Sequence, residues 1–158
     1  MHHVLLLQPE YCVDCRSCQL ACSLKHEGAF RPSKSRIEVL TSPLKFSVPL
    51  TCLQCEEPAC AAVCVVHALE KNPETGVVDY DAAKCIGCRM CVSACPFGNI
   101  SYDRESRSVI KCDVCDGEPE CARFCPTDAI QWVRADLETL ARKKAMSDKF
   151  EQVFGKEV

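Results

Sequence analysis

Aromatic residues make up only 6% of this 158-residue sequence, and the sequence contains no long apolar run. Phe, Tyr and Trp bury the largest apolar areas, so this composition leaves little material for an ordinary hydrophobic core. No segment approaches the roughly 18 apolar residues that a membrane-spanning helix needs. We therefore expect a chain outside the membrane whose fold depends on something other than a large apolar core.

The sequence also lacks the signatures of several functional classes. A net charge of −3 provides no basic face for nucleic acid. No glycine-rich dinucleotide loop follows a predicted strand, and no nucleophile has a neighbouring base, so we expect no catalytic residues in this chain. The apolar run at residues 4–7 is too short for a secretory signal, and no twin-arginine motif is present. We therefore expect a cytoplasmic protein.

Cysteine, in contrast, is abundant, and its sixteen residues all fall into four local quartets. Three closely spaced thiols and a fourth after three further residues form the pattern of bacterial [4Fe–4S] ferredoxins. Because each cubane takes four thiolates, the sequence predicts four [4Fe–4S] clusters with every cysteine as an iron ligand. The quartets are Cys12, Cys15, Cys18 and Cys22; Cys52, Cys55, Cys60 and Cys64; Cys85, Cys88, Cys91 and Cys95; and Cys112, Cys115, Cys121 and Cys125.

Two other uses of dense cysteine fit this pattern less well. Disulfide scaffolds belong to secreted proteins, and the expected address here is intracellular. Zinc sites usually join two cysteine pairs across a gap of about a dozen residues or more, whereas these quartets are compact. His26 and His67 are not needed as ligands, because the thiols already match four cubanes. Since exposed clusters of this type tolerate oxygen poorly, we expect an anaerobic setting.

The four quartets define a repeat with short strands between its units. We expect each quartet to form a tight loop that continues into a helical turn carrying its fourth cysteine. Pro96 and Pro126 are expected to end two of these helices. Hairpins are predicted around residues 42–43, 72–76 and 103–105, and strands at residues 4–7 and 129–132. The prediction is an α+β fold of two pseudo-symmetric bacterial ferredoxin-like lobes.

The C-terminal segment differs from the rest of the chain. Residues 134–158 contain no cysteine and no proline, and apolar residues recur there at roughly helical spacing among basic ones. This pattern predicts an amphipathic C-terminal helix. We expect it either to pack on its own lobe or to dock a partner subunit or a second copy of the chain. The predicted division is therefore a four-cluster domain at residues 1–133 and a helical tail at 134–158.

In two-cluster ferredoxins, the fourth cysteine of one run ligates the other cluster. Applied to four quartets, this rule allows two schemes. Neighbouring quartets pair, first with second and third with fourth, or the pairing is nested, second with third and first with fourth. The spacing alone does not decide between them.

The chain resembles the four-cluster iron–sulfur subunits that serve molybdenum- and tungsten-pterin oxidoreductases, hydrogenases and formate dehydrogenases. The resemblance covers residues 3–132. It rests on the order of the four quartets and on three motifs: Asp81-x2-Lys84-Cys85-Ile86-Gly87-Cys88, Cys95-Pro96-Phe97-Gly98, and Lys111-Cys112-Asp113.

The resemblance implies the nested pairing. The implied ligand sets are Cys12, Cys15, Cys18 and Cys125; Cys22, Cys112, Cys115 and Cys121; Cys52, Cys55, Cys60 and Cys95; and Cys64, Cys85, Cys88 and Cys91. An inner lobe would then span about residues 51–97, and an outer lobe would combine residues 3–50 with 98–133.

The function implied by the resemblance is that of a non-catalytic subunit that passes single electrons between a catalytic subunit and a second redox partner. We favour a tungsten-pterin aldehyde oxidoreductase as the catalytic partner, because this chain is small and lacks long insertions and a membrane helix. A flavin- or NAD-linked subunit, or a ferredoxin, is the expected second partner. The alternatives are a free-standing polyferredoxin carrier and the small subunit of a hydrogenase, a formate dehydrogenase or an aromatic-ring reductase.

Residues beside the quartets have expected roles as well. A nearby cation raises the potential of a cluster, because reduction adds a negative charge. For Arg16, Lys84, Arg89 and Lys111, however, the preferred interpretation is a solvated surface cation. Gly87 is expected to leave room for a close approach of the backbone to a cluster.

Overall fold

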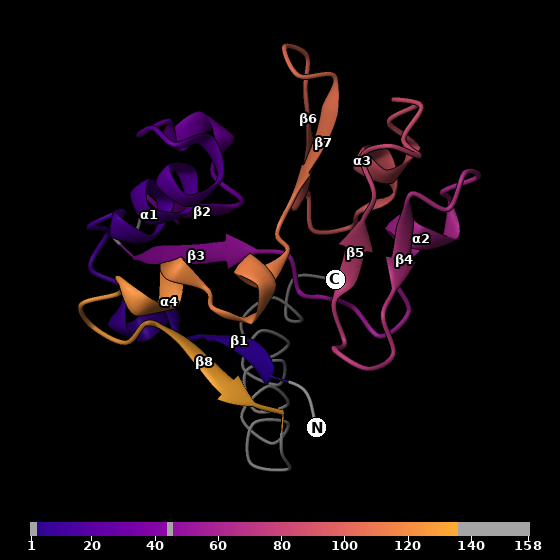
Figure 1. Cartoon of the computed structure of the whole chain (residues 1–158). Coiled ribbons are helices and arrows are strands. Elements are labelled where there is room, and N and C mark those ends of the chain that lie inside the picture. Colours follow the sequence, from indigo (N-terminus) through magenta and orange to yellow (C-terminus); the bar gives the residue numbers. More distant parts are fainter. Residues whose placement is uncertain (1–2, 44–45, 136–158) are drawn as a thin grey trace, which may run out of the picture.

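The computed structural model of the chain describes residues 3–43 and 46–135. In this part of the chain, short strands pair into four two-stranded antiparallel sheets (Figure 1). Because an isolated two-stranded sheet is only marginally stable in water, each depends on packing against other elements. The strands are β1 (His3–Leu7), β2 (Ile37–Thr41), β3 (Ser47–Thr51), β4 (Leu69–Lys71), β5 (Val78–Tyr80), β6 (Ile100–Asp103), β7 (Ser108–Lys111) and β8 (Ile130–Arg134).

Three of the sheets are hairpins of consecutive strands, and they confirm the hairpins predicted from the sequence. They pair β2 with β3, β4 with β5, and β6 with β7. In the β4–β5 turn, Asn72 Oδ1 accepts hydrogen bonds from the N–H groups of Glu74 and Thr75. Asp103 makes the same kind of turn contact with the N–H groups of Glu105 and Ser106. The side chains of these turn residues therefore fix the hairpin ends locally.

The fourth sheet joins segments from opposite ends of the described chain. β1 runs antiparallel to β8, with Leu5 opposite Trp132 and Leu7 opposite Ile130. The N–H of Gln8 extends this ladder by donating to Ala129 O at 2.8 Å. The strands predicted at residues 4–7 and 129–132 are thus confirmed, and their pairing places the first and last quartets in the same part of the molecule (Figure 1).

The helices are α1 (Ser17–Glu27), α2 (Ala59–Ala62), α3 (Met90–Ala94) and α4 (Glu120–Arg123), with 3-10 turns η1 (Pro9–Tyr11), η2 (Pro32–Lys34) and η3 (Val114–Gly117). Among the fourth cysteines of the quartets, Cys22 lies inside its helix. The prediction that every fourth cysteine lies in a helical turn is wrong for Cys64, Cys95 and Cys125, which come after the ends of α2, α3 and α4.

Proline explains part of this difference. A residue before proline is pushed out of the helical region, and Cys95, which precedes Pro96, is extended with φ −74° and ψ 113°. The first quartet is followed by Ser23 instead, so α1 continues beyond it to Glu27. It ends at Gly28, whose left-handed φ of 67° is favourable for glycine at a helix C-terminus.

The buried side chains form two separate cores. We call the first the terminal core, because its residues come from both ends of the described chain: Cys18, Cys22, Ile37, Val39, Cys121 and Ile130. The second, the central core, consists of Cys60, Leu69, Val78, Cys91, Ile100 and Val109. In Figure 1 the β6–β7 hairpin stands between the two groups of elements, and it packs Ile100 and Val109 into the central core.

Two predictions concern segments at the limits of the described residues. Arg134 is the last residue of β8, and residues 136–158 of the predicted amphipathic helix lie outside the described ranges. Within those ranges, no helix has both the length and the apolar character that crossing a bilayer requires.

Candidate functional site

The loops that carry the thiols contain backbone conformations that ordinary residues rarely adopt. Arg16 and Arg89 directly precede α1 and α3, and both have left-handed backbones, with φ of 57° and 64°. Asp14 and Gln54 have positive φ as well. Such conformations cost free energy in residues other than glycine and collect at functional sites, where the surrounding structure holds them in place. Here they occur within the first, second and third quartets.

Cys18 lies beside two thiols of its own quartet and one from the far end of the described chain. Burial raises the pKa of Cys18 to about 11, and the neighbouring thiols Cys15, Cys12 and Cys125 raise it further. Cys12 and Cys125 both pack against the terminal core that contains Cys18. This first thiol set therefore combines two residues before α1 and Cys18 in its first turn with a residue after α4.

A second thiol set surrounds Cys121, which is also buried in the terminal core. Burial raises the pKa of Cys121 far above its usual value, and the neighbouring thiols that raise it further include Cys112, Cys22 and Cys115. Burial also raises the pKa of Cys115, and Cys22 is among the groups that raise it further. The last quartet thus contributes three thiols to this set, and α1 contributes the fourth.

The third and fourth thiol sets lie at the central core. Burial raises the pKa of Cys60, and the neighbouring thiols Cys52 and Cys95 add to this effect. Burial likewise raises the pKa of Cys91, with further increases from Cys88 and Cys85. An apolar cavity is lined by residues that include Cys64, Cys85, Cys88 and Cys91. Cys95 of the third quartet thus lies beside Cys60 of the second, and Cys64 of the second quartet lines the same cavity as three cysteines of the third.

Neighbouring thiol sets are close enough to interact. In addition to burial, Cys18 of the first set raises the pKa of Cys121 in the second. Likewise, Cys52 of the third set adds to the burial that raises the pKa of Cys112 in the second. The third and fourth sets share the central core through Cys60 and Cys91. The four sets therefore form a series from the first to the fourth.

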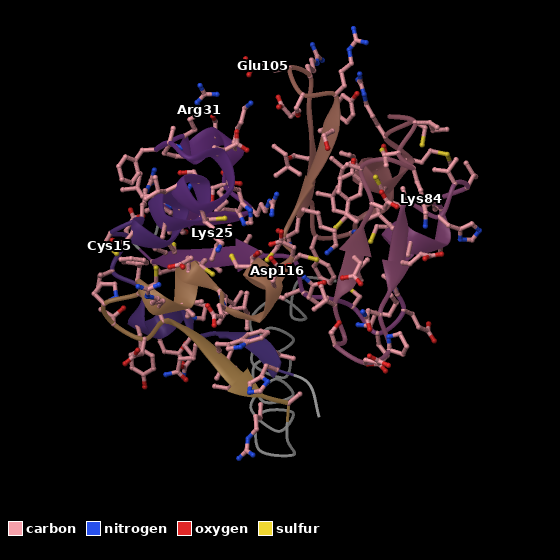
Figure 2. The ribbon with its side chains drawn as sticks, viewed as in Figure 1. Cys15, Lys25, Arg31, Lys84, Glu105 and Asp116 are labelled. Atoms are coloured by element: carbon pink, nitrogen blue, oxygen red, sulfur yellow. The ribbon has the colours of Figure 1, made fainter. Side chains whose placement is uncertain are left out.

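Exposure distinguishes the two ends of this series. Of the sixteen cysteines, all within the described ranges, only Cys15 and Cys88 are exposed. Cys15 belongs to the first set and Cys88 to the fourth. In Figure 2, Cys15 lies at one edge of the molecule and Lys84, close to Cys88 in sequence, near the opposite edge, with sulfur atoms spread between them. The two ends of the series thus reach the surface.

The surroundings of the sulfur atoms suit iron–sulfur clusters. Backbone N–H groups of Arg36 and Ala68 donate to the Sγ atoms of Cys22 and Cys64, each at 3.2 Å. Such hydrogen bonds stabilise thiolate and help to set cluster potentials. Burial disfavours a charged thiolate that has no cation nearby. A bound metal group supplies that positive charge, so buried thiols in groups of four are suited to binding one. The donors present therefore fit four cubanes.

The interpretation of Lys111 as a surface cation is wrong, because only 4% of this residue is exposed. Its ammonium group donates hydrogen bonds to Val78 O, Cys112 O and Gln54 Oε1. Arg16, Lys84 and Arg89 are exposed, as expected. The carbonyl acceptors that hold Lys111 lie on other strands and loops, so the sequence carried no signal for its burial beyond its position next to Cys112.

Glycine at position 87 leaves space that the Tyr102 side chain occupies. The φ of Gly87 is +70°, and a Cβ atom at this position would lie 3.1 Å from the Tyr102 hydroxyl oxygen. The Tyr102 ring in turn packs under Arg89, whose guanidinium carbon lies 4.3 Å from the ring centroid. The glycine thus leaves room for a side chain that packs against the central core.

We expect Gly87→Ala to release iron about fivefold faster than Gly98→Ala during anaerobic challenge with a chelator. Both alanines must adopt a left-handed backbone, which costs about 1 kcal/mol or more. Only the alanine at 87 also displaces Tyr102, because nothing lies within 4 Å of a Cβ at Gly98. The added strain is on the order of 1 kcal/mol, or a factor of about five. Equal release rates for the two variants would contradict this role of Gly87.

Two families of iron–sulfur domains match the sequence. The family described as 4Fe-4S dicluster domain matches residues 44–135, which is more than half of the chain. The family described as 4Fe-4S binding domain matches residues 9–25, around the first quartet. Together the two matches cover cysteines of all four quartets.

Curated proteins with similar sequences include subunits of different oxidoreductases. The polyferredoxin-like subunit of aliphatic sulfonate oxidoreductase from Pyrococcus furiosus is 37% identical, over 87% of this chain and 82% of that protein. The beta subunit of NADH-dependent phenylglyoxylate dehydrogenase from Aromatoleum evansii is 33% identical, over 84% of this chain but 30% of that subunit. The thiosulfate reductase electron transfer subunit PhsB from Salmonella typhi is 28% identical, over 95% of this chain and 85% of that protein.

Among solved structures, a chain of the active site complex BamBC of benzoyl coenzyme A reductase has a similar fold. Its TM-score is 0.50 at 24% sequence identity, over 97% of this chain and 91% of that chain. At this identity the similarity concerns the fold alone. It agrees with the observed mixture of short helices and antiparallel hairpins.

Proposed function

We propose that this chain, which belongs to the 4Fe-4S dicluster domain family, is the electron-transfer subunit of a larger oxidoreductase complex. It carries four [4Fe–4S] clusters, in keeping with its sixteen cysteines and both family matches. Each cluster, when bound, accepts and releases one electron at a time. The observation that carries the proposal is the series of four thiol sets, in which only the first and the last contain an exposed cysteine.

For the ligands of the clusters, we propose the nested pairing. Its support is the position of the exchanged cysteines: Cys125 lies beside Cys18, and Cys22 lies beside Cys115 and Cys121. In the central core, Cys95 lies beside Cys60, and Cys64 lines the same cavity as Cys91. A pairing of neighbouring quartets would instead require Cys64 to join the first quartet, and the two belong to different cores.

The pairing supports a two-lobe organisation, which we propose in the form suggested by the sequence. The inner lobe, about residues 51–97, contains the central core apart from Ile100 and Val109. The outer lobe combines residues 3–50 with 98–133 and contains the terminal core. The β6–β7 hairpin belongs to the outer segment by sequence and packs on the inner core, so it joins the two lobes. We further propose that the two lobes are related by pseudo-symmetry.

The chain's own residues hold the thiol sets in place and shield them from water. Arg36 N and Ala68 N orient two of the exchanged thiols. The second set is enclosed most completely, because all four of its cysteines are buried. Around the exposed Cys88, the side chains of Ile86 and Met90 are 65% and 51% exposed, and around Cys15, Val13 is 63% exposed. Exposed apolar side chains at both ends of the series are consistent with docking of redox partners there.

For the catalytic partner we propose a tungsten-pterin aldehyde oxidoreductase, on the basis of the resemblance described above. The similar curated proteins serve aliphatic sulfonate, phenylglyoxylate and thiosulfate enzymes, so the substrate class is the least constrained part of the proposal. A flavin- or NAD-linked subunit, or a ferredoxin, would exchange electrons at the other end. The main alternative, a free-standing polyferredoxin carrier, is disfavoured because the relative from Pyrococcus furiosus is itself named as a subunit.

An anaerobic purification of the native protein from its source cell tests this proposal. We expect it to co-purify with a larger chain and with stoichiometric tungsten or molybdenum. Nickel in place of these metals would indicate a hydrogenase partner and contradict the tungsten assignment. A brown protein that purifies alone at native expression levels, with about sixteen irons as four cubanes require, would contradict the subunit role and support the free carrier.

A further inference from the structure

Lys111, the last residue of β7, has an ammonium group enclosed by uncharged acceptors. Its Nζ donates to Val78 O at 2.7 Å, to Cys112 O at 2.8 Å and to Gln54 Oε1 at 3.2 Å. These three acceptors match the three donors of the ammonium group, and none of them carries a negative charge. A buried cation without a paired anion is costly. The compensating charge must therefore come from other groups around Lys111.

The thiols of two different sets flank the residues that hold this charge. Lys111 directly precedes Cys112, whose carbonyl oxygen accepts from the ammonium group, and Gln54, which also accepts from it, stands between Cys52 and Cys55. Cys52 and Cys55 belong to the third thiol set and Cys112 to the second. These two sets interact with each other through Cys52 and Cys112. Lys111 thus lies where the two middle sets of the series meet.

Gln54 links the same two sets by hydrogen bonds. It stands between Cys52 and Cys55 in the sequence, and its Nε2 donates to Cys112 O at 2.9 Å. Its Oε1 accepts from Val78 N at 2.9 Å and from Lys111 Nζ. The loop of the third set is therefore tied to the first cysteine of the last quartet through one amide and one ammonium group. This arrangement fixes the ammonium between the two sets.

We propose that Lys111 is a positioning residue that raises the reduction potentials of the two middle clusters together. The inference rests on the proposed function and pairing, since it assigns Cys52 and Cys55 to the third cluster and Cys112 to the second. Reduction of either cluster adds one electron and one negative charge, and a fixed cation nearby stabilises that charge. No covalent bond forms or breaks in this step. Because the two clusters share this cation, replacing Lys111 is expected to change both reduction potentials.

A purely structural role for Lys111 is the competing explanation, and Lys71 shows that the chain uses lysine in this way. Lys71 Nζ donates to the carbonyl oxygens of Gln54, Cys55 and Gly76 at 2.7–2.9 Å. A lysine can therefore simply tie backbone carbonyls together. The test of Lys111 needs a measurement that the loss of these hydrogen bonds alone would not change. The reduction potential of a cluster is such a measurement when iron content is preserved.

The test is an anaerobic redox titration, followed by electron paramagnetic resonance, of the full chain with its four clusters. In Lys111→Gln, we expect the reduced-to-oxidised ratio of two clusters to fall roughly tenfold at a fixed ambient potential. For a one-electron couple this corresponds to a shift of about 59 mV. Lys111→Arg keeps the charge and should hold both ratios within about twofold of the unmodified protein. The matched control is Lys34→Gln, because Lys34 pairs with Asp103 and Glu105 instead.

Unchanged potentials in a Lys111→Gln protein with full iron content would overturn the proposal, as would an equal shift of all four clusters. If Lys111→Gln loses iron, Gln54→Glu decides. It places a carboxylate beside the ammonium and keeps the bonds from Lys111 to Val78 O and Cys112 O. A fall in two potentials supports the proposal, and four unchanged potentials overturn it. Failure of the pairing itself would be seen separately, in the cysteine replacements described below, as loss of iron from the wrong thiols.

Discussion

Replacing Cys125 by serine is expected to remove the iron bound by Cys12, Cys15 and Cys18 and to spare the iron bound by Cys112, Cys115 and Cys121. Cys125 is the last cysteine of its own quartet in sequence but lies beside Cys18 in the fold. Loss of one cubane from four removes about a quarter of the iron. Anaerobic alkylation followed by peptide mass spectrometry identifies the freed thiols, because iron-bound thiolates are protected from the reagent.

The reciprocal control is Cys22→Ser, since Cys22 lies beside Cys115 and Cys121. This variant should free Cys112, Cys115 and Cys121 and should protect the three thiols that Cys125→Ser exposes. If Cys125→Ser instead frees Cys112, Cys115 and Cys121, each quartet holds its own cluster and the nested pairing is wrong. Iron content must be measured in both variants, so that general unfolding is recognised by loss of all the iron.

Removal of all iron is expected to unfold most of the described chain. Seven of the eighteen buried apolar residues in the described ranges are cysteines, so proposed cluster ligands make up much of the cores. In the same ranges the sheets have two strands each, and three of the four helices span only four or five residues. Helices and sheets of this size are marginal in water without tertiary packing. Cluster binding energy is therefore also folding energy.

Circular dichroism during anaerobic chelation measures this effect. We expect most of the secondary-structure signal to disappear together with the iron–sulfur absorbance, and to return when iron and sulfide are added back under reducing conditions. The reconstituted protein is the control, because it separates reversible unfolding from damage by the chelator. An iron-free chain that keeps its circular dichroism and its amide chemical-shift dispersion would show that the two cores fold without clusters.

The hairpins were predictable from the sequence because their signals are local. Asn72 and Asp103 accept hydrogen bonds from backbone groups two and three residues ahead, and this depends only on nearby residues. Helix length was less predictable. The three-residue spacing before each fourth cysteine suits a helical turn, yet three of the helices end before that cysteine. At Cys95 the following proline is a cause, because it disfavours helical backbone in the residue before it.

Lys111 shows the limit of local reasoning for the site. Its position beside Cys112 was visible in the sequence, and its burial was not. The burial depends on β5, which supplies Val78 O, and on the loop that contains Gln54. These segments are separated from Lys111 by 33 and 57 residues. Only the docking of the β6–β7 hairpin against the central core brings them to the ammonium group.

The sequence by itself determined the number and spacing of the thiols available to clusters, because four thiols at short spacing are a local property of the chain. It also determined the hairpins, whose turns are closed by neighbouring side chains. The tertiary structure decided which quartets lie together, since the β1–β8 pairing and the two cores bring Cys125 to Cys18 and Cys22 to Cys121. Contacts between residues so distant in sequence depend on the packing of whole elements, which residue spacing alone leaves open.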